Sequence, residues 1–344
     1  MNVRRYLFTV IAGAALLCAL LSGCAVHQWP ELEDAVEDAP LRIHLSFHTE
    51  MTLWEHEYDI NTKKLTEIQT ESPVVYDNTQ STGVIRYIVR IYPRTETRNA
   101  RSYLQELDLT RELTKDGYDF DTELTLPFGE YRIVAWADIR GDDAEKEYYD
   151  ASDFASVVST RHSLNTDYRD AFRGAENVKL EYDSASPAAK TVQIEMHRPL
   201  AKCEIIAEGI EDFLRKNPAR SGLSDYRLIL AYQSYTPFAY SAMTDLLVDS
   251  RYGEYFESRF TPIDETSASL GFDYHLVRSE GSSTILQVAV FGPDGEELSM
   301  SNPVQIPLRR DHHTVVRGKF LSGNASGGFV GVDPRFEGDF NIFR

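Results

Sequence analysis

The sequence predicts a mostly β protein with two β-sandwich domains. Three observations support this fold class. Short segments in which apolar and polar residues alternate recur along the chain, helical patterns are few, and a small polar segment broken by proline separates two β-rich halves. The chain has 344 residues, 42% of them hydrophobic, which is enough for two domain cores.

The N-terminus has the features of an export signal. Arg4 and Arg5 precede an apolar run over 6–21, which is typical of a secretory signal peptide and is short for a membrane-spanning helix of about 20 residues. The next residues, 21–24, read Leu-Ser-Gly-Cys and resemble the lipobox of bacterial lipoproteins. We therefore expect residues 1–23 to be removed and Cys24 to carry lipid. The other interpretation is an ordinary secretory signal with an incidental cysteine.

Residues 24–40 are expected to form a flexible tether between the lipid and the folded body. This segment contains five acidic residues and lacks apolar periodicity. An acidic stretch soon after the lipidated cysteine also resembles the surface-export signal of Bacteroides-group lipoproteins, although a merely solvated linker fits equally well.

Residues 41–182 are predicted to form the N-terminal β-sandwich domain. Apolar side chains alternate with polar ones from Leu41 to His48, which predicts a half-buried strand. Further strands are expected over 84–92 and 131–137. A short helix is expected over 97–107, where Thr97 can serve as the N-cap.

Residues 183–190 are predicted to be a linker, because they are small, polar and interrupted by proline. Residues 191–344 then form the C-terminal β-sandwich domain. Its strands are expected over 192–196, 203–207, 226–231, 284–291 and 313–321, with a helical turn over 209–216 and a tight turn over 292–295.

Charge and cysteine content limit the classes of function. The net charge is −19, and about −21 once Arg4 and Arg5 are removed, so the surface would repel nucleic acid. Cys18 leaves with the signal and Cys24 carries lipid, which leaves Cys203 alone. No intramolecular disulfide and no four-cysteine zinc site can form, and we expect Cys203 to be a buried packing residue.

No known catalytic or metal-binding motif is present. The chain lacks a phosphate-binding glycine loop, a Gly-x-Ser-x-Gly elbow and a His-Glu-x-x-His segment. His312 and His313 are adjacent, so in a strand they face opposite sides. Trp136, between two alanines, is expected to be a core residue rather than a platform for a ligand. We therefore expect no catalytic residue, no metal site and no cofactor.

Three segments carry a family resemblance. They are LPFGEYRIVAWAD at 126–138, RPLAK at 198–202 and IPLRRDHHTVVRGKFL at 306–321. Together with the lipobox, they resemble the FimB-type fimbrial anchor-subunit family of Bacteroides-group type V pili and the related uncharacterised surface lipoprotein families. The resemblance implies two transthyretin-like β-sandwich domains and no catalytic residues, and only Cys24 carries over as a functional position.

The function implied by the resemblance is structural. The expectation is a surface-exposed lipoprotein of the cell outer membrane, a fimbrial anchor or accessory subunit in cell adhesion that pairs with other subunits by β-strand exchange. Ser184, in Asp183-Ser184-Ala185, also resembles the O-glycosylation site of exported Bacteroides-group proteins. Two alternatives stay open: a glycan-binding surface lipoprotein of a nutrient-uptake system, and a lipoprotein hydrolase built on distant carboxylates.

Overall fold

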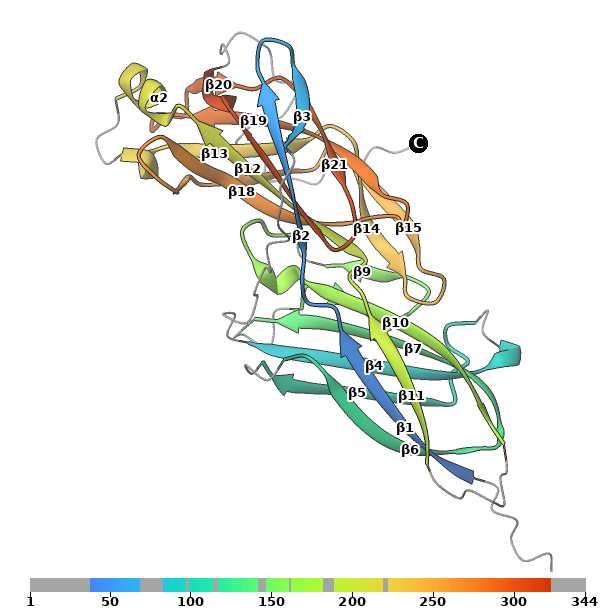
Figure 1. Ribbon diagram of the computed structural model, residues 1–344. Helices are drawn as coiled ribbons and strands as arrows, with labels where there is room; N and C mark the ends of the chain where they lie inside the picture. The colour runs from blue at the N-terminus through green and yellow to red at the C-terminus, as the bar shows by residue number, and fades with distance from the viewer. Residues whose placement is uncertain are drawn as a thin grey trace, which may run out of the picture.

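The protein is a mostly β molecule of two lobes, stacked end to end along one axis (Figure 1). The computed structural model describes residues 38–68, 83–96, 99–113, 117–141, 147–160, 162–181, 189–218 and 222–322. None of the helices among these residues is long and apolar enough to cross a membrane. The signal peptide 1–23, Cys24 and Ser184 lie outside the described residues.

The first lobe is a sandwich of a three-stranded sheet, ordered β11-β1-β6, and a four-stranded sheet, ordered β10-β7-β4-β5. Apolar side chains of both sheets meet in one core, in which Leu41, Ile43 and Leu45 of β1 are fully buried. Their polar neighbours on β1 face outward, as the alternating pattern predicts. The strands are β1 (Asp38–Phe47), β4 (Val84–Pro93), β5 (Gln105–Glu112), β6 (Phe120–Pro127), β7 (Gly129–Arg140), β10 (Ala171–Leu180) and β11 (Lys190–Met196).

The second lobe is a sandwich of a six-stranded sheet, ordered β17-β18-β12-β22-β2-β3, and a sheet ordered β16-β13-β19-β20 in which β21 also pairs with β19. The central strand β12 is buried along nearly its whole length because both of its edges are paired and both faces are covered, and it includes the buried Lys202. The strands are β2 (Thr52–Asp59), β3 (Lys64–Ile68), β12 (Leu200–Glu208), β13 (Arg227–Tyr232), β16 (Tyr255–Ser258), β17 (Thr261–Pro262), β18 (Ser267–Leu276), β19 (Ser282–Phe291), β20 (Glu297–Met300), β21 (Val304–Leu308) and β22 (His312–Gly318).

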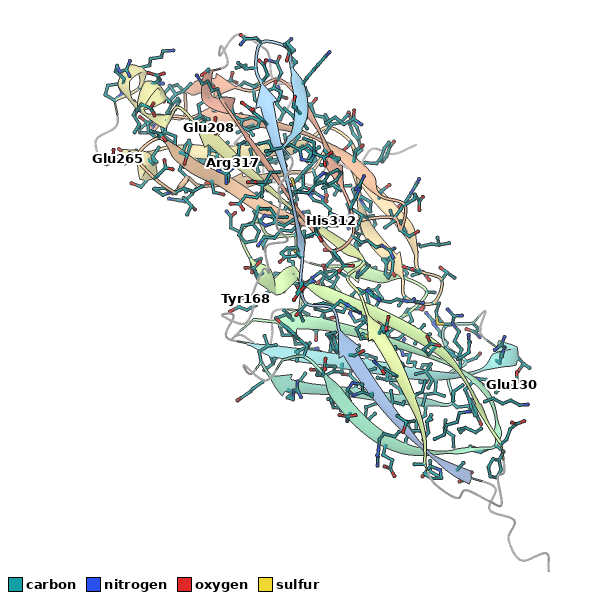
Figure 2. All side chains as sticks on the ribbon, in the orientation of Figure 1. Glu130, Tyr168, Glu208, Glu265, His312 and Arg317 are labelled. Carbon is teal, nitrogen blue, oxygen red and sulfur yellow. The ribbon has the colours of Figure 1, made fainter. Side chains whose placement is uncertain are left out.

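A smaller sheet, ordered β15-β14-β9-β8, lies where the lobes meet. Its strands are β8 (Tyr149–Asp150), β9 (Val157–Ser159), β14 (Tyr235–Ser241) and β15 (Leu246–Tyr252). The helical elements are short: η2 (Arg94–Glu96), η3 (Asp167–Arg169), α2 (Ile210–Lys216), η4 (Gly222–Asp225) and η5 (Phe320–Ser322). Figure 2 shows that the lobes are filled with side chains, with Glu130 in the first lobe, Glu208 and Glu265 in the second, and Tyr168 near their junction.

Strand pairing differs from the expected division into 41–182 and 191–344. β2 and β3 precede most of the first lobe in sequence but belong to the second, because β2 pairs in parallel with β22. β11 belongs to the first lobe, because it pairs in parallel with β1. The chain therefore crosses from the first lobe to the second at 48–51, the first crossing, and at 197–199, the second crossing. It also passes from β3 of the second lobe back to β4 of the first, through residues 69–82, which lie outside the described residues. Most of the expected linker 183–190 lies outside the described residues, and its last residue already belongs to β11.

Two local expectations also need correction. The helix predicted over 97–107 is wrong, because residues 105–107 begin the edge strand β5. Tertiary pairing with β4 outweighs the helical propensity of this polar segment. The expected tether 24–40 is also too long, because β1 begins at Asp38. The other expected strands are present, and α2 confirms the helical turn at 209–216.

The lobes share a buried apolar core at their junction. Trp136, on the face of the four-stranded sheet that points away from the first core, is fully buried there. Its ring contacts Tyr149 of β8 and Tyr240 of β14, with centroids 5.5 and 6.0 Å away. The indole Nε1 donates a hydrogen bond to Asp138 at 2.8 Å. Trp136 is therefore a core residue, as expected, and the junction is packed like a domain interior.

One buried guanidinium joins the crossings at 48–51 and 197–199. Arg198 lies in the second crossing and donates from Nε to both carboxylate oxygens of Asp170, at 2.8 and 3.0 Å. Its Nη1 and Nη2 donate to the backbone carbonyls of His48, Thr49 and Glu50 in the first crossing. The side chain is 1% exposed. Burial acts to lower the pKa of Arg198, yet the Asp170 carboxylate raises it above its usual value.

This arrangement predicts a large stability cost when the guanidinium is removed. Arg198→Ala leaves a buried carboxylate and three carbonyls without their donor, so the free energy of unfolding should fall by about 3–5 kcal/mol. Arg198→Lys, the matched control, keeps the charge but cannot donate in the forked geometry of a guanidinium. It should lower the free energy of unfolding by less than Arg198→Ala does. Urea denaturation measures both variants. A loss of about 0.5 kcal/mol for Arg198→Ala, as for a surface substitution, would contradict this role.

Candidate functional site

Strand β15 presents an open edge at the junction of the lobes. It pairs with β14 on one side, from Tyr235↔Tyr252 to Ser241↔Leu246, and no described strand pairs with its other side. Backbone donors and acceptors on such an edge can accept a strand from another protein. The geometry of this hairpin therefore makes it the candidate functional site.

The same strand also exposes apolar side chains. Leu246, Val248 and Tyr252 are 62%, 51% and 54% exposed, and Tyr235 of the neighbouring strand is 67% exposed. These are four of the eight large apolar side chains that are exposed among the described residues. Exposed apolar residues that lie together on one surface indicate an interaction site, whereas single exposed apolar residues are common on any protein.

An open groove lies between this hairpin and the neighbouring strands of the second lobe. It has a volume of about 390 Å³ and is lined by residues of β14, β15, β18, β19 and β21, among them Pro237, Val248 and Thr284. Apolar side chains of β15 thus lie next to a concave surface that can receive side chains of a bound strand.

The hairpin is held to the body by hydrogen bonds at its turn. The Tyr240 hydroxyl donates to Asp245 Oδ1 at 2.5 Å, and Arg310 Nη1 donates to the same oxygen at 2.7 Å. On the far side of β14, Ala239 and Tyr240 pair with β9. The edge is therefore fixed in position while its outer side stays open.

The exposed tyrosines do not form a flat platform for a sugar ring. Tyr235 and Tyr252 are neighbours across the hairpin, with centroids 5.4 Å apart, but their planes are tilted by 56°. A glycan-binding protein is expected to present exposed aromatic rings that are coplanar, and this pair does not provide them.

The first strand is not an open edge. From the sequence, two segments are candidates for pairing with a partner: 41–48, which is nearest the tether, and 329–344, which follows the last expected strand. β1 is internal to its sheet, with β11 on one side and β6 on the other, so 41–48 is excluded. Residues 329–344 lie outside the described residues. The sequence did not predict strand β15 or its open edge. Its residues, Leu-Leu-Val-Asp-Ser-Arg-Tyr, do not show the regular alternation of apolar and polar side chains that marks a strand.

Cys203 is a packing residue, as expected. It is free, 4% exposed and part of the second-lobe core. Burial raises the pKa of its thiol well above the usual value, with Asp273 and Glu204 adding to the effect. A thiol held neutral in this way is a poor nucleophile.

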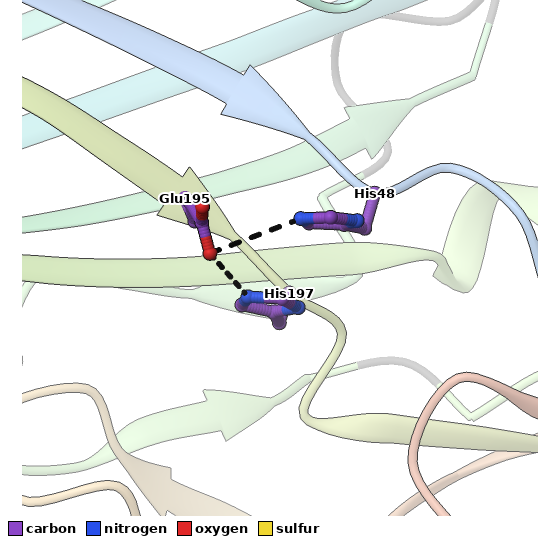
Figure 3. Close-up of side chains that lie close together, drawn as sticks. All are labelled: His48, Glu195 and His197. Carbon is purple, nitrogen blue, oxygen red and sulfur yellow. Dashed lines mark ion pairs between the residues drawn. The ribbon is translucent and has the colours of Figure 1, made fainter.

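One group of potential metal ligands comes together among the described residues: His48, Glu195 and His197 (Figure 3). No chelating spacing marks it in sequence, because His48 is separated from the other two by about 150 positions and is brought to them by the pairing of β1 with β11. The alternation of Val192, Ile194 and Met196 could have placed Glu195 and His197 together on the opposite face of one strand.

Comparisons with known proteins give remote structural similarities and one family. No curated protein matches the chain in sequence. A candidate adhesin from Bacteroides ovatus is 10% identical, with 81% of this chain and 89% of that chain covered and a TM-score of 0.44. The fimbrial anchor protein Mfa2 from Porphyromonas gingivalis is 11% identical, with coverage of 76% and 82% and a TM-score of 0.41. A fimbrial assembly protein from Parabacteroides distasonis is 10% identical, with coverage of 81% and 91% and a TM-score of 0.37.

Similarities this remote do not assign a function. The family model, by contrast, matches nearly the whole folded body, over residues 39–342, and it is described as a family of unknown function, DUF6562. The chain belongs to the DUF6562 family.

Proposed function

We propose that this protein is a lipid-anchored structural protein of the cell surface, a fimbrial anchor or accessory subunit that binds another subunit by β-strand pairing. The observation that carries the proposal is the open edge of β15 with exposed Leu246, Val248 and Tyr252. The lipobox ending at Cys24 and the family resemblance of the sequence support it. The proposed role is mechanical attachment and not catalysis.

The contrast with another sheet edge supports a binding role for β15. β5 is the edge strand of the four-stranded sheet and exposes Asp108, Thr110 and Glu112. Charged side chains of this kind discourage pairing with a foreign strand. β15 also exposes two charged residues, Asp249 and Arg251, but it exposes Leu246, Val248 and Tyr252 beside them. The exposed residues of β5 are all polar, so the apolar surface distinguishes β15 and is expected of a strand that a partner covers.

The position of β1 suits an anchor at Cys24. β1 begins at Asp38, at the end of the first lobe that lies farthest from the second lobe (Figure 1). The 14 residue steps from Cys24 to Asp38 can span at most roughly 45–50 Å. A lipid on Cys24 would therefore hold the molecule by that end, with the second lobe directed away from the membrane. Ser184, as an O-glycosylation site, stays a separate proposal, testable by mass spectrometry of the native protein.

Lipid attachment predicts that Cys24→Ala abolishes incorporation of labelled fatty acid, because no other cysteine follows the signal before Cys203. The variant should leave the membrane fraction, since two or more acyl chains are what anchors the protein stably. Metabolic labelling and fractionation of cells measure both effects. Cys203→Ser is the matched control and should keep the label. A Cys24→Ala variant that still labels and stays with the membrane would refute the lipobox interpretation.

Strand pairing predicts that proline on β15 abolishes partner binding. Val248 is skipped in the register between β15 and β14, so Val248→Pro should spare the hairpin while it obstructs a strand ladder on the open edge. Capture of the partner from native membranes should therefore fall at least about tenfold. Val248→Ile keeps the donor, the β-branched shape and the apolar surface, and should bind like the wild type. Ser250→Pro provides a second test if Val248→Pro unfolds.

The melting temperature of each variant separates lost binding from lost folding. A folded proline variant that still captures the same subunit would contradict the proposal. If no subunit is captured by the wild type while a polysaccharide binds, the glycan-binding alternative replaces it.

A further inference from the structure

We propose that His48, Glu195 and His197 bind one divalent transition-metal ion, with Zn²⁺ as the reference ion, where the chain crosses between the lobes. The three side chains are exposed and converge from two neighbouring strands (Figure 3). This site is independent of the β15 edge and departs from the expectation that the protein has no metal site.

The parallel pairing of β1 with β11 brings the ligands to one face. Phe47 is the partner of Met196, and the amide of His48 donates to the Met196 carbonyl at 3.1 Å. Side chains two positions apart on a strand face the same side, so Glu195 and His197 flank the buried Met196 on the outer face. His48 reaches the same face from the end of β1.

The distances fit coordination better than hydrogen bonding. Glu195 Oε2 lies 3.6 Å from His197 Nε2 and 4.0 Å from His48 Nε2. Both distances are too long for hydrogen bonds, which need about 2.7–3.2 Å. Two ligand atoms bound tetrahedrally to one Zn²⁺ lie about 3.3 Å apart, given bonds of about 2.0–2.1 Å. The ligand atoms, all within 4.8 Å of one another, therefore need only small side-chain rotations to close on an ion.

The two imidazole rings lie face to face beside the carboxylate. The rings of His48 and His197 are stacked, with centroids 4.4 Å apart and planes 8° from parallel. Each imidazole can offer one nitrogen lone pair to a metal ion. Two imidazoles and one carboxylate form a ligand set suited to Zn²⁺, and water would occupy the remaining position.

The backbone beneath the ligands is fixed in advance. Arg198 donates to the His48 carbonyl at 3.0 Å. Arg173 and His197 exchange two backbone hydrogen bonds, at 2.8 and 3.0 Å. Gly174 lets β10 approach β11 so closely that a Cβ there would lie 2.7 Å from the Glu195 carbonyl oxygen. Rigid support of this kind lowers the entropy lost when an ion binds.

Further acidic groups lie beside the proposed site. Asp311 and Glu50 line the same groove as His48 and His197. Asp311 already forms an ion pair with Arg198, with Nη1 and Oδ1 3.7 Å apart, so Glu50 is the carboxylate that adds negative charge to the groove. Since His48 belongs to the first crossing and His197 to the second, a bound ion would join the two crossings on the outside, as Arg198 does on the inside.

Titration of the full chain in detergent, stripped with chelator, tests the site. Calorimetry with ZnCl₂ should show one saturable ion per chain. Glu195→Gln and His197→Ala should each weaken binding at least about tenfold, because loss of an outer-shell partner alone costs about 10- to 100-fold. Free Zn²⁺ at a concentration 100 times its dissociation constant should raise the melting temperature of the wild type by about 5 °C.

His44→Ala is the matched control. His44 lies on β1, the strand that precedes His48, and its Nδ1 is 3.0 Å from Oδ1 of a single carboxylate, Asp121. Loss of the His44 imidazole should therefore leave the zinc affinity unchanged. With Cu²⁺ as the probe, electron paramagnetic resonance should show coupling to two nitrogens in the wild type and to one in His197→Ala. Absence of saturable binding, an equal loss in His44→Ala, or coupling to a single nitrogen in the wild type would overturn the proposal.

Discussion

The Arg198 guanidinium is the group on which the arrangement of the two lobes depends. Burying a charge is costly unless it is paired and all its donors are used. Here Asp170 accepts from Nε, and the carbonyls of His48, Thr49 and Glu50 accept from the other nitrogens. The guanidinium also lies over the Phe172 ring, 4.6 Å from its centroid. Because the three carbonyls belong to the first crossing and Arg198 to the second, displacement of one lobe would break several of these bonds at once.

The proposed binding edge depends on this junction as well. The sheet that carries β15 contains β8 and β9, whose residues follow the first-lobe strand β7 in sequence, and β14, which lies in the second half of the chain. Its buried face contributes Tyr240 to the core around Trp136. Orientation of the edge relative to β1, and therefore to the proposed lipid, is set by the same contacts that join the lobes. A protein that transmits a load from a membrane to a partner needs a fixed path of this kind, and the ion pair and the shared core supply it.

Local patterns in the sequence were sufficient to predict the mostly β fold and many of the strands. Alternation such as that of Leu41, Ile43 and Leu45 shows which side chains of a strand are buried. These patterns could not predict which strands belong to which lobe. The pairings of β1 with β11 and of β2 with β22 decide this, and they join segments far apart in sequence. Arg198 stood within a conspicuous Arg-Pro-Leu segment, yet its partner Asp170 could be identified only in three dimensions. The edge at β15 and the ligands His48, Glu195 and His197 depend likewise on pairing and exposure, which local sequence does not report.

Photo-cross-linking in living cells tests the central claim, that β15 is covered by a partner subunit, most directly. A photoreactive amino acid in place of Tyr252, on the open edge, should cross-link this protein to one fimbrial-type subunit, identified by mass spectrometry. The same amino acid in place of Tyr103, which is 37% exposed and packs on Tyr92 of the first lobe, should give no such product. Cross-links of equal yield from both positions, or none from Tyr252 while the subunit still co-purifies, would contradict the claim.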